Sequence, residues 1–183
     1  MAIANKQQIR QIKIALRSNI APKLRQQKEQ QIFQDFFNNH IVQNSKNIAI
    51  YYPIKGEVDT ILIIKKLFAT KINVFLPRML GDNLQFYQIT NLTVDLEFNQ
   101  RYGLYEPLIT LPIIDKNKLD VVVVPIVAFD QAHFRLGYGK GYYDRFLKDY
   151  QKTIIGLAFI EQLVSQQLPI EKHDIRIKTI ISA

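Results

Sequence analysis

The spacing of apolar side chains changes along the chain, and each change predicts a new helix or strand. Between residues 6 and 17, Ile9, Ile12 and Leu16 recur every three or four positions, which is the spacing of an amphipathic helix. Residues 26–40 repeat this spacing without glycine or proline and predict a second helix. The amino-terminal part of the chain is therefore expected to be helical.

A β-α-β unit is expected next. Residues 46–52 are a short β-rich run that Pro53 closes. Asp59 or Thr60 can cap a helix through the apolar segment ILIIKKLF, and the strand-like segment INVFLP follows that helix. Two strands joined in this way through a helix usually lie parallel in one sheet.

The segment LDVVVVP, residues 119–125, is β-branched and almost uniformly apolar, as expected for a strand that is buried on both faces of a parallel sheet. We place it at the centre of the sheet. A polar loop with glycines follows at 128–141, then a helix at 142–150 and a strand at 153–159. Residues 84–89 and 179–182 are expected to add further strands.

These elements predict an α/β fold, specifically a three-layer α/β/α sandwich with a largely parallel, Rossmann-like central sheet. No long linker, low-complexity stretch or internal repeat divides the chain, so a single domain is expected over residues 1–183. Open sheets of this class bind ligands beyond the carboxyl ends of their central strands, and the glycine loop follows such an end.

Composition narrows the possible chemistry. The 183 residues include no cysteine, which excludes disulfides, thiolate zinc sites, iron–sulfur clusters and cysteine nucleophiles. The longest apolar run, 121–129, is interrupted by Pro125 and is too short to cross a bilayer, so no membrane partner is expected. The opening MAIANKQQIRQ lacks the apolar stretch of a secretory signal, and we expect a cytoplasmic protein.

Charge points to an anionic partner. Lysine and arginine total 24 against 16 acidic residues, a formal charge of +8. In the first predicted helix, four basic residues form a stripe beside the apolar one: Lys6, Arg10, Lys13 and Arg17. We expect the helix to dock by its apolar face and to present its positive face to a ligand. A solvated basic face and a mitochondrial transit peptide are the alternatives.

Residues 135–145 read RLGYGKGYYDR, and three glycines at alternate positions would allow backbone amides to approach a polyphosphate, with Lys140 adding charge. The loop is not a Walker A motif, because Phe134 stands where that motif needs glycine and Gly141 where it needs serine or threonine. It is not a Rossmann fingerprint, because Tyr142 replaces the third glycine. A flexible surface turn remains the alternative.

Eight segments together resemble the 5-formyltetrahydrofolate cyclo-ligase family, also called methenyltetrahydrofolate synthetase. In chain order they are KQQIR, YYPIKGEVDT, FLPRM, YGLYEP, PIVAFD, RLGYGKGYYDR, IGLAF followed by Gln162, and LPIEKHD. The resemblance covers nearly the whole chain. Departures from the family pattern are Ile126 after Pro125, His133 where a turn glycine is frequent, and an Ile-Ser-Ala end.

The resemblance implies binding sites for ATP and for a reduced folate. The implied ATP-binding residues are Lys6, Arg10, Arg135, Leu136, Gly137, Tyr138, Gly139, Lys140, Gly141, Tyr142 and Tyr143. The implied folate-binding residues are Tyr52, Glu57, Tyr138, Gly139, Lys140, Gly141 and Tyr142. Lys140 and Arg135 are the implied catalytic cations. Lysine and arginine are the donors that phosphate recognition favours, and a carboxylate can accept the pterin's ring hydrogens.

The resemblance also implies that Asp144 and Asp174 hold Mg²⁺, which takes one or two carboxylates and completes its shell with phosphate oxygens and water. The alternatives are a helix cap for Asp144 and an ordinary turn for Asp174. For Tyr52 the alternative is a core aromatic at a strand end. Arg78 is carried as a candidate contact for phosphate or for the glutamate tail of folate. The three histidines, His40, His133 and His173, show no ligand spacing.

The implied reaction is the ATP- and Mg²⁺-dependent cyclisation of 5-formyltetrahydrofolate to 5,10-methenyltetrahydrofolate by a monomeric enzyme, with release of ADP and phosphate. Two other functions stay open from the residues alone. One is nucleic-acid binding through the positive charge and the nine tyrosines and eleven phenylalanines, although no RNA-binding motif supports it and we expect no nucleic-acid partner. The other is a kinase that uses the same ATP site with a different acceptor.

Overall fold

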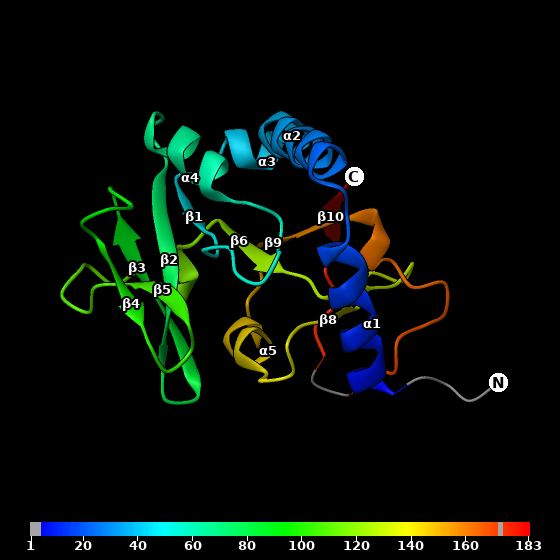
Figure 1. Cartoon of the computed structure of the whole chain (residues 1–183). Helices are drawn as coiled ribbons and strands as arrows, with labels where there is room; N and C mark the ends of the chain where they lie inside the picture. Colours follow the sequence, from blue (N-terminus) through cyan, green and yellow to red (C-terminus); the bar gives the residue numbers. More distant parts are fainter. Residues whose placement is uncertain (1–4, 172–173) are drawn as a thin grey trace.

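The computed structural model describes residues 5–171 and 174–183 and confirms the α/β fold with a central sheet of six strands (Figure 1). The strand order is β10-β9-β6-β1-β2-β3, and all neighbours are parallel except the antiparallel pair β2 and β3. These strands are β1 (Asn47–Ala49), β2 (Asn73–Leu80), β3 (Asn83–Ile89), β6 (Val121–Pro125), β9 (Thr153–Ala158) and β10 (Thr179–Ser182). As predicted, β6 is central and the first β-α-β unit is parallel.

Two small antiparallel sheets lie outside the main one, and the sequence did not predict them. The first is formed by β4 (Leu96–Asn99) and β5 (Leu104–Pro107), and the second by β7 (Ala128–Phe129) and β8 (Arg135–Leu136). The first hairpin is held against β2, because Glu106 Oε1 accepts a hydrogen bond of 2.9 Å from the backbone amide of Met79. Strands this short carry too few residues for a recognisable alternation of apolar and polar positions.

Helices cover both faces of the sheet. Figure 1 shows α2, α3 and α4 on one face and α5 on the other, with α1 standing beside the carboxyl end of the sheet. The α-helices are α1 (Lys6–Ser18), α2 (Pro22–Asn38), α3 (His40–Gln43), α4 (Ile61–Phe68) and α5 (Tyr142–Leu147), and the 3-10 turns are η1 (Lys116–Lys118) and η2 (Ile160–Gln162). No helix of the described residues is long and apolar enough to cross a membrane.

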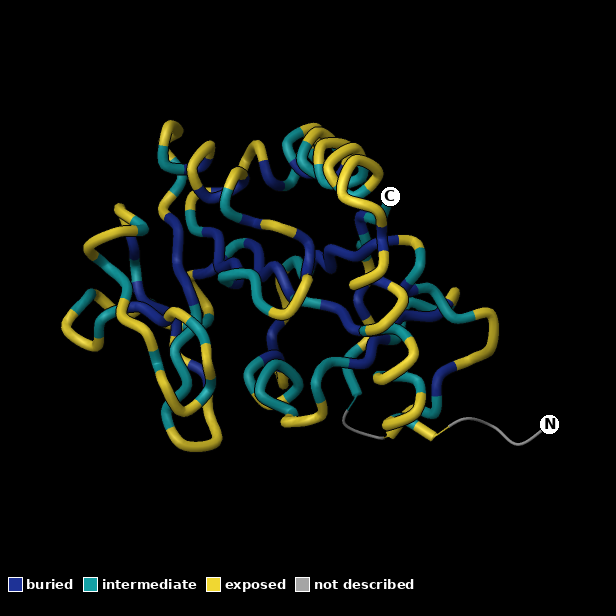
Figure 2. The backbone as a smooth tube through the Cα atoms, in the orientation of Figure 1, coloured by how far each residue is buried: buried dark blue, intermediate teal, exposed yellow. Residues whose placement is uncertain are grey.

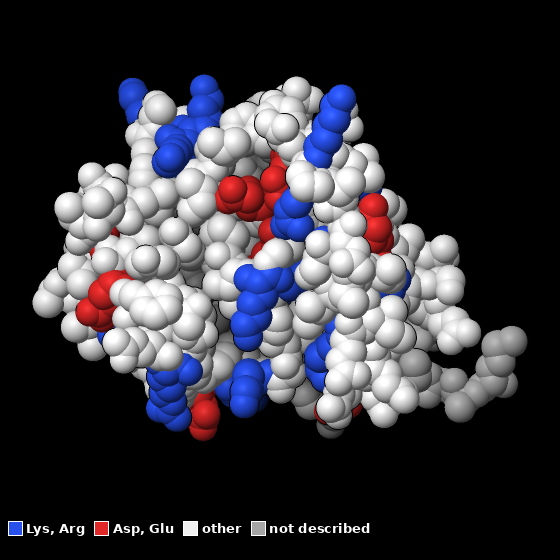
Figure 3. Space-filling view, in the orientation of Figure 1, with Lys and Arg blue, Asp and Glu red and all other residues white. Residues whose placement is uncertain are grey.

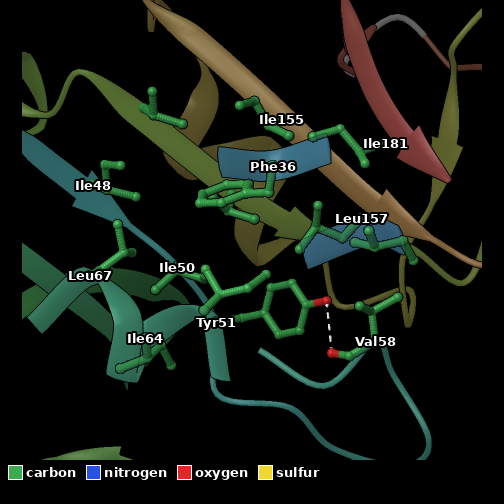
Figure 4. Close-up of a cluster of buried hydrophobic side chains, with 14 of the residues drawn as sticks. Phe36, Ile48, Ile50, Tyr51, Val58, Ile64, Leu67, Ile155, Leu157 and Ile181 are labelled. Carbon is green, nitrogen blue, oxygen red and sulfur yellow. Dashed lines mark hydrogen bonds between the residues drawn. The ribbon is translucent and has the colours of Figure 1, made fainter. Parts of the chain in front are cut away.

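Alternate residues of the central strands enter two hydrophobic clusters, one on each face of the sheet. Ile48, Val121 and Val123 face α2, α3 and α4 in the first cluster (Figure 4), whereas Ala49 and Val122 belong to the second, under α5. The buried backbone of these strands forms the dark centre of the molecule in Figure 2. Because both faces of β6 are buried, its successive residues are all apolar, and this apolar run is the pattern that predicted the strand.

The predicted bounds of two helices were wrong. The second helix starts at Pro22 rather than at residue 26, because proline suits the first turn of a helix, where its missing amide hydrogen is not needed. It ends at Asn38, and the short α3 follows. The helix expected at 142–150 stops at Leu147, since Asp149 adopts φ +63°, which a helix cannot contain.

The prediction that the first helix docks by its apolar face was also wrong. Arg17, on the basic stripe, is 0% exposed, whereas Ile12 and Leu16 are 54% and 44% exposed. The basic side chains point inward because they bind backbone carbonyls of loops at the end of the sheet. Lys13 Nζ, for example, donates to the carbonyls of Glu161 at 3.0 Å and Leu163 at 2.5 Å. A helix can thus pack by its polar face where loops offer unpaired acceptors.

Candidate functional site

A cavity of about 410 Å³ lies beyond the carboxyl ends of β1 and β6, between α1, the glycine loop and the β4–β5 hairpin. Every residue that the sequence implied for ATP, folate or magnesium lines it. Lysine and arginine atoms gather near the middle of the face in Figure 3, beside a hollow between the two halves of the molecule. The structure therefore brings together, at one cavity, residues from both ends of the chain.

Two glycines of the loop are required by its geometry. Gly139 and Gly141 have φ of +89° and +67°, in the region that side chains disfavour. The guanidinium of Arg10 lies against the loop, where its Nε donates to the carbonyl of Gly137 at 2.8 Å. Lys140 lines the cavity and is exposed, and no hydrogen bond or ion pair to another described residue is found for it. Its ammonium is thus available to an anionic ligand.

A buried arginine, Arg135, and a half-buried aspartate, Asp144, form an ion pair at one side of the cavity. Arg135 Nη1 donates to Asp144 Oδ1 at 2.8 Å, and the arginine side chain is only 3% exposed. Asp144 lies in the first turn of α5, but that helix has no side-chain cap, so the capping alternative for Asp144 is wrong. Because both side chains are largely shielded from solvent, their electrostatic interactions are stronger than they would be in water.

Asp174 is paired with the amino-terminal helix. Lys6 Nζ lies 2.8 Å from Asp174 Oδ2 and also 2.8 Å from Glu171 Oε1. Burial opposes the charge on Lys6, but the hydrogen bonds that Lys6 donates to these two carboxylates, together with their negative charge, outweigh it and raise the pKa of the lysine. Asp174 Oδ2 also accepts a hydrogen bond of 2.7 Å from the backbone amide of Glu171. Asp174 therefore stabilises a local turn as well, which was the alternative interpretation of this residue. The neighbouring His173 lies outside the described residues.

Glu57 places a nearly buried carboxyl group in the cavity. It is 5% exposed, and its Oε2 accepts a hydrogen bond of 2.9 Å from the amide of Ile54. Burial raises the pKa of Glu57 to about 7, against the opposing effects of the Ile54 hydrogen bond and the positive charge of Arg17. The group can therefore change its charge near neutral pH.

Tyr52 is half-buried: it lines the cavity and also packs against the first hydrophobic cluster, whereas its neighbour Tyr51 lies inside that cluster at 3% exposure. The Tyr51 hydroxyl donates to the carbonyl of Val58 (Figure 4). The ring of Tyr52 packs on Tyr105 of β5 at a centroid distance of 5.5 Å. The core-aromatic alternative for Tyr52 therefore holds in part, because the ring packs against the cluster with one side and borders the cavity with another.

Sequence reasoning missed several residues that line the cavity, among them Lys55, Tyr102, Tyr105 and Glu106. Three of these lie in the unpredicted β4–β5 hairpin or its turn. Glu106 is 1% exposed and accepts hydrogen bonds from Met79 and Asn99, so it holds the hairpin in place. The segment YGLYEP was noted, but only the packing of the hairpin on β2 shows that it faces the site.

Arg78 is not among the described residues that line the cavity. Its Nη1 donates to Glu97 Oε1 at 2.5 Å and to the carbonyl of Pro107 at 2.6 Å. These bonds tie β2 to the two strands of the small hairpin, which is a structural role and removes the reason for treating Arg78 as a ligand contact. His133 Nδ1 lies 3.1 Å from the carbonyl of Ile177, outside the cavity.

The residues of the cavity fit a magnesium ion only together with a ligand. Within the described residues, no group of three or more histidine, cysteine or acidic side chains could hold a metal by itself. Asp144 and Asp174 are two hard oxygen donors in one cavity, and Mg²⁺ commonly takes two carboxylates while phosphate oxygens and water complete its shell. The donor set therefore suits an ion that arrives with a nucleotide.

Comparison with known proteins gives a consistent result. Residues 2–183 match the model of the 5-formyltetrahydrofolate cyclo-ligase family. The 5-formyltetrahydrofolate cyclo-ligase of Haemophilus influenzae is 32% identical over 99% of both chains, and that of Escherichia coli K12 is 31% identical over 91% of this chain and 93% of the relative. The solved structure of Aquifex aeolicus 5,10-methenyltetrahydrofolate synthetase superimposes with a TM-score of 0.85 at 28% identity, covering 97% of this chain and 89% of that one.

Proposed function

The chain belongs to the 5-formyltetrahydrofolate cyclo-ligase family, and we propose that its cavity binds Mg-ATP at the glycine loop and 5-formyltetrahydrofolate at the turn that carries Glu57. The reaction of this family is the ATP-dependent cyclisation of 5-formyltetrahydrofolate to 5,10-methenyltetrahydrofolate, and the chain is an enzyme of this kind. The observation that carries the proposal is that the loop and the turn line one cavity.

On the nucleotide side, Lys6, Arg10 and Lys140 would neutralise the phosphates, while the glycine loop would bring its backbone amides close to them. Arg10 supports this assignment because its guanidinium is fixed against the loop by the bond to the Gly137 carbonyl. Separating Lys6 from Glu171 and Asp174 costs free energy. Phosphate oxygens would offset this cost by binding the same ammonium group. Arg135 lies behind the loop and, with Asp144, would hold charge near the transferring group.

On the folate side, the ionised carboxylate of Glu57 would accept hydrogen bonds from the amino and ring donors of the pterin. Tyr52 would stack on the flat part of the ligand, with Tyr105 packed against it at an interplanar angle of 54°. Tyr142 bridges the entrance, since its hydroxyl donates to the Gly81 carbonyl at 3.2 Å and lies 3.5 Å from the Tyr102 hydroxyl. These contacts would limit the access of water to the reacting groups.

The reaction needs an activated formyl oxygen, because an amide-like oxygen is a poor leaving group. We propose that this oxygen attacks the γ-phosphorus of ATP and that ADP departs. N10 then attacks the formyl carbon and loses its proton, and phosphate leaves as the five-membered ring closes. The protein's contribution is alignment and stabilisation of charge on the phosphoryl oxygens, which suits Lys140 and Arg135 and requires no covalent nucleophile.

Asp144 and Asp174 would hold the magnesium ion, which supplies positive charge to the phosphates when bound. Each carboxylate already has a basic partner, Arg135 for Asp144 and Lys6 for Asp174. This pairing would keep both groups oriented before the nucleotide arrives. A monomeric state and a cytoplasmic location stay predictions from the sequence.

The proposal is tested by mixing the purified protein with ATP, MgCl₂ and 5-formyltetrahydrofolate and following the absorbance of methenyltetrahydrofolate. ADP, phosphate and product are expected in equal amounts, and turnover should stop when the metal is chelated. A phosphorylated acceptor without ring closure would instead indicate a kinase. Salt-sensitive binding of RNA without ATP turnover would indicate a nucleic-acid-binding protein.

A further inference from the structure

Two buried or half-buried arginines hold the turn that carries Glu57. Three successive carbonyls of this turn accept their hydrogen bonds: Arg17 Nη2 donates to Lys55 at 2.9 Å, and Arg25 Nη2 donates to Gly56 at 2.9 Å and to Glu57 at 2.7 Å. Lys55 and Gly56 have φ of +46° and +72°. A lysine adopts such a conformation only where its surroundings hold it, so the shape of the turn depends on these anchors.

Arg17 differs from Arg25 because it also reaches the glycine loop. The same nitrogen that donates to the Lys55 carbonyl donates to the hydroxyl of Tyr138 at 2.5 Å, and the guanidinium lies 5.7 Å from the centre of the Tyr138 ring. Its second terminal nitrogen donates to the Ile126 carbonyl at 3.1 Å, at the end of the central strand. The guanidinium therefore links the turn, the loop and the sheet.

The position of Arg17 excludes a direct role in binding. Its side chain is 0% exposed, and it is not among the described residues that line the cavity. The residues it contacts do line it: Lys55 and Tyr138 face the ligand space. A planar, rigid guanidinium with two acceptors on one nitrogen transmits a displacement of either acceptor to the other, which a flexible ammonium does less well.

We propose that Arg17 is a positioning residue that couples nucleotide binding at the glycine loop to folate binding at the turn of Glu57, with the Tyr138 hydroxyl as the contact on the loop side. The inference rests on the proposed function of the two segments. Nucleotide binding that orders Tyr138 also fixes Arg17, which in turn holds the Lys55 carbonyl and the adjoining Glu57. The second ligand then meets a site that is already ordered, so its affinity rises.

The coupling is measured by calorimetric titration with 5-formyltetrahydrofolate in the absence and in the presence of saturating AMP-PNP and Mg²⁺. AMP-PNP replaces ATP because its terminal phosphoryl group is not transferred, so both ligands stay bound. The ratio of the two folate Kd values is the coupling factor. For the wild-type protein we expect a factor of about five or more, in the range typical of coupled sites.

Tyr138→Phe keeps the ring and removes the hydroxyl, which contacts both Arg17 and the carboxyl group of Glu57, and we expect its coupling factor to fall toward one. Arg17→Lys should act in the same direction. Arg25→Lys is the matched control, because Arg25 holds the same turn without a hydrogen bond to the loop. This control should weaken folate binding while the coupling factor stays close to that of the wild type. A loss of folate affinity that is the same with and without AMP-PNP cancels in this ratio.

A wild-type factor of one, or a Tyr138→Phe protein that keeps the wild-type factor, would overturn the inference. A loss of coupling in Arg25→Lys as large as in Tyr138→Phe would also overturn it, because the turn alone would then carry the effect. A folded Arg17→Lys protein that keeps the wild-type factor would overturn it as well, because the direct contact of Tyr138 with Glu57 would then carry the coupling. Should Arg17→Lys fail to fold, Arg17→Gln takes its place in this comparison. The wild-type turnover assay tests the proposed function separately, since an enzyme that makes methenyltetrahydrofolate can still show no coupling.

Discussion

The guanidinium of Arg10 lies in the space that a side chain on Gly139 would enter. A Cβ atom at this glycine would be 3.1 Å from Cζ of Arg10, and the φ of +89° at Gly139 is one that other residues rarely adopt. The helix and the loop are thus fitted to each other at a position where only glycine is accommodated.

We therefore expect Gly139→Ala to raise the KM for ATP and to lower the free energy of unfolding by about 1–3 kcal/mol, the usual cost of a side chain in a strained backbone region. The matched control is Gly137→Ala, because a Cβ there would meet no described atom within 4 Å. The control should cost less in both measurements. Equal effects of the two substitutions on ATP kinetics and urea denaturation would contradict the fit between Arg10 and Gly139.

Lys140 should matter for the chemical step and little for folding, because it is exposed and lies between two glycines of a polar loop. Lys140→Ala should lower kcat/KM by about a hundredfold or more, as is usual when one preorganised electrostatic donor is removed. Lys140→Arg should rescue only part of the activity, since a planar guanidinium does not replace a compact ammonium. A folded Lys140→Ala protein with nearly wild-type turnover would rule out this loop as the catalytic phosphate site.

Glu57 should make stability depend on pH. Because burial raises its pKa from 4.5 to about 7 in the folded state, its contribution to stability is fully present below about pH 4.5 and is lost as pH rises through about 7. The full loss corresponds to about 3 kcal/mol. Urea denaturation at several pH values between 4.5 and 8.5 should show this decline in the wild type and a smaller decline in Glu57→Gln. Identical slopes would show that Glu57 does not titrate in this window.

The same substitution should weaken folate more than ATP, because Glu57 faces the ligand whose ring carries hydrogen-bond donors. Separate titrations with 5-formyltetrahydrofolate and with AMP-PNP distinguish the two effects. Equal weakening of both ligands, or of neither, would mean that the folate does not meet Glu57.

Asp144→Asn and Asp174→Asn should each raise the Mg²⁺ concentration needed for half-maximal turnover, because each removes a charge that would hold the ion. Asp144→Asn should in addition lower the melting temperature, since it leaves Arg135, which is 3% exposed, beside a neutral amide. Asp82→Asn is a suitable control, because Asp82 is exposed and its neighbour Arg145 contacts its backbone carbonyl. An unchanged Mg²⁺ requirement in both variants would remove the two aspartates from the metal site.

Several features of the fold were readable in the sequence because they depend on local patterns. The uniform apolar run at 121–124 predicted a strand buried on both faces, and the strand is central. The changes in the spacing of apolar residues predicted a β-α-β unit, and the structure confirms it as β1, α4 and β2. The segment with alternating glycines predicted a loop, and in that loop Gly139 and Gly141 adopt positive φ angles, which glycine allows.

The site residues named from the sequence depended on the family resemblance more than on patterns. Neither Asp144 nor Asp174 could be distinguished from an ordinary cap or turn by spacing alone. The structure adds that both line the same cavity and that each is paired with a cation. Tyr51 and Tyr52 illustrate the same limit, because two adjacent tyrosines at a strand end gave no reason to assign one to the core and the other to the cavity.

What the sequence determined by itself was the order and kind of the principal elements, because periodicity in a segment records which of its own faces is buried. Only the tertiary structure decided how α1 packs. Its apolar stripe predicted burial of Ile12, yet the helix buries Arg17, because distant segments offer the carbonyls of Lys55 and Ile126 and the hydroxyl of Tyr138 as acceptors. Hydrogen-bond partners from other parts of the chain have no counterpart in the local pattern, so polarity alone could not show that this arginine lies inside.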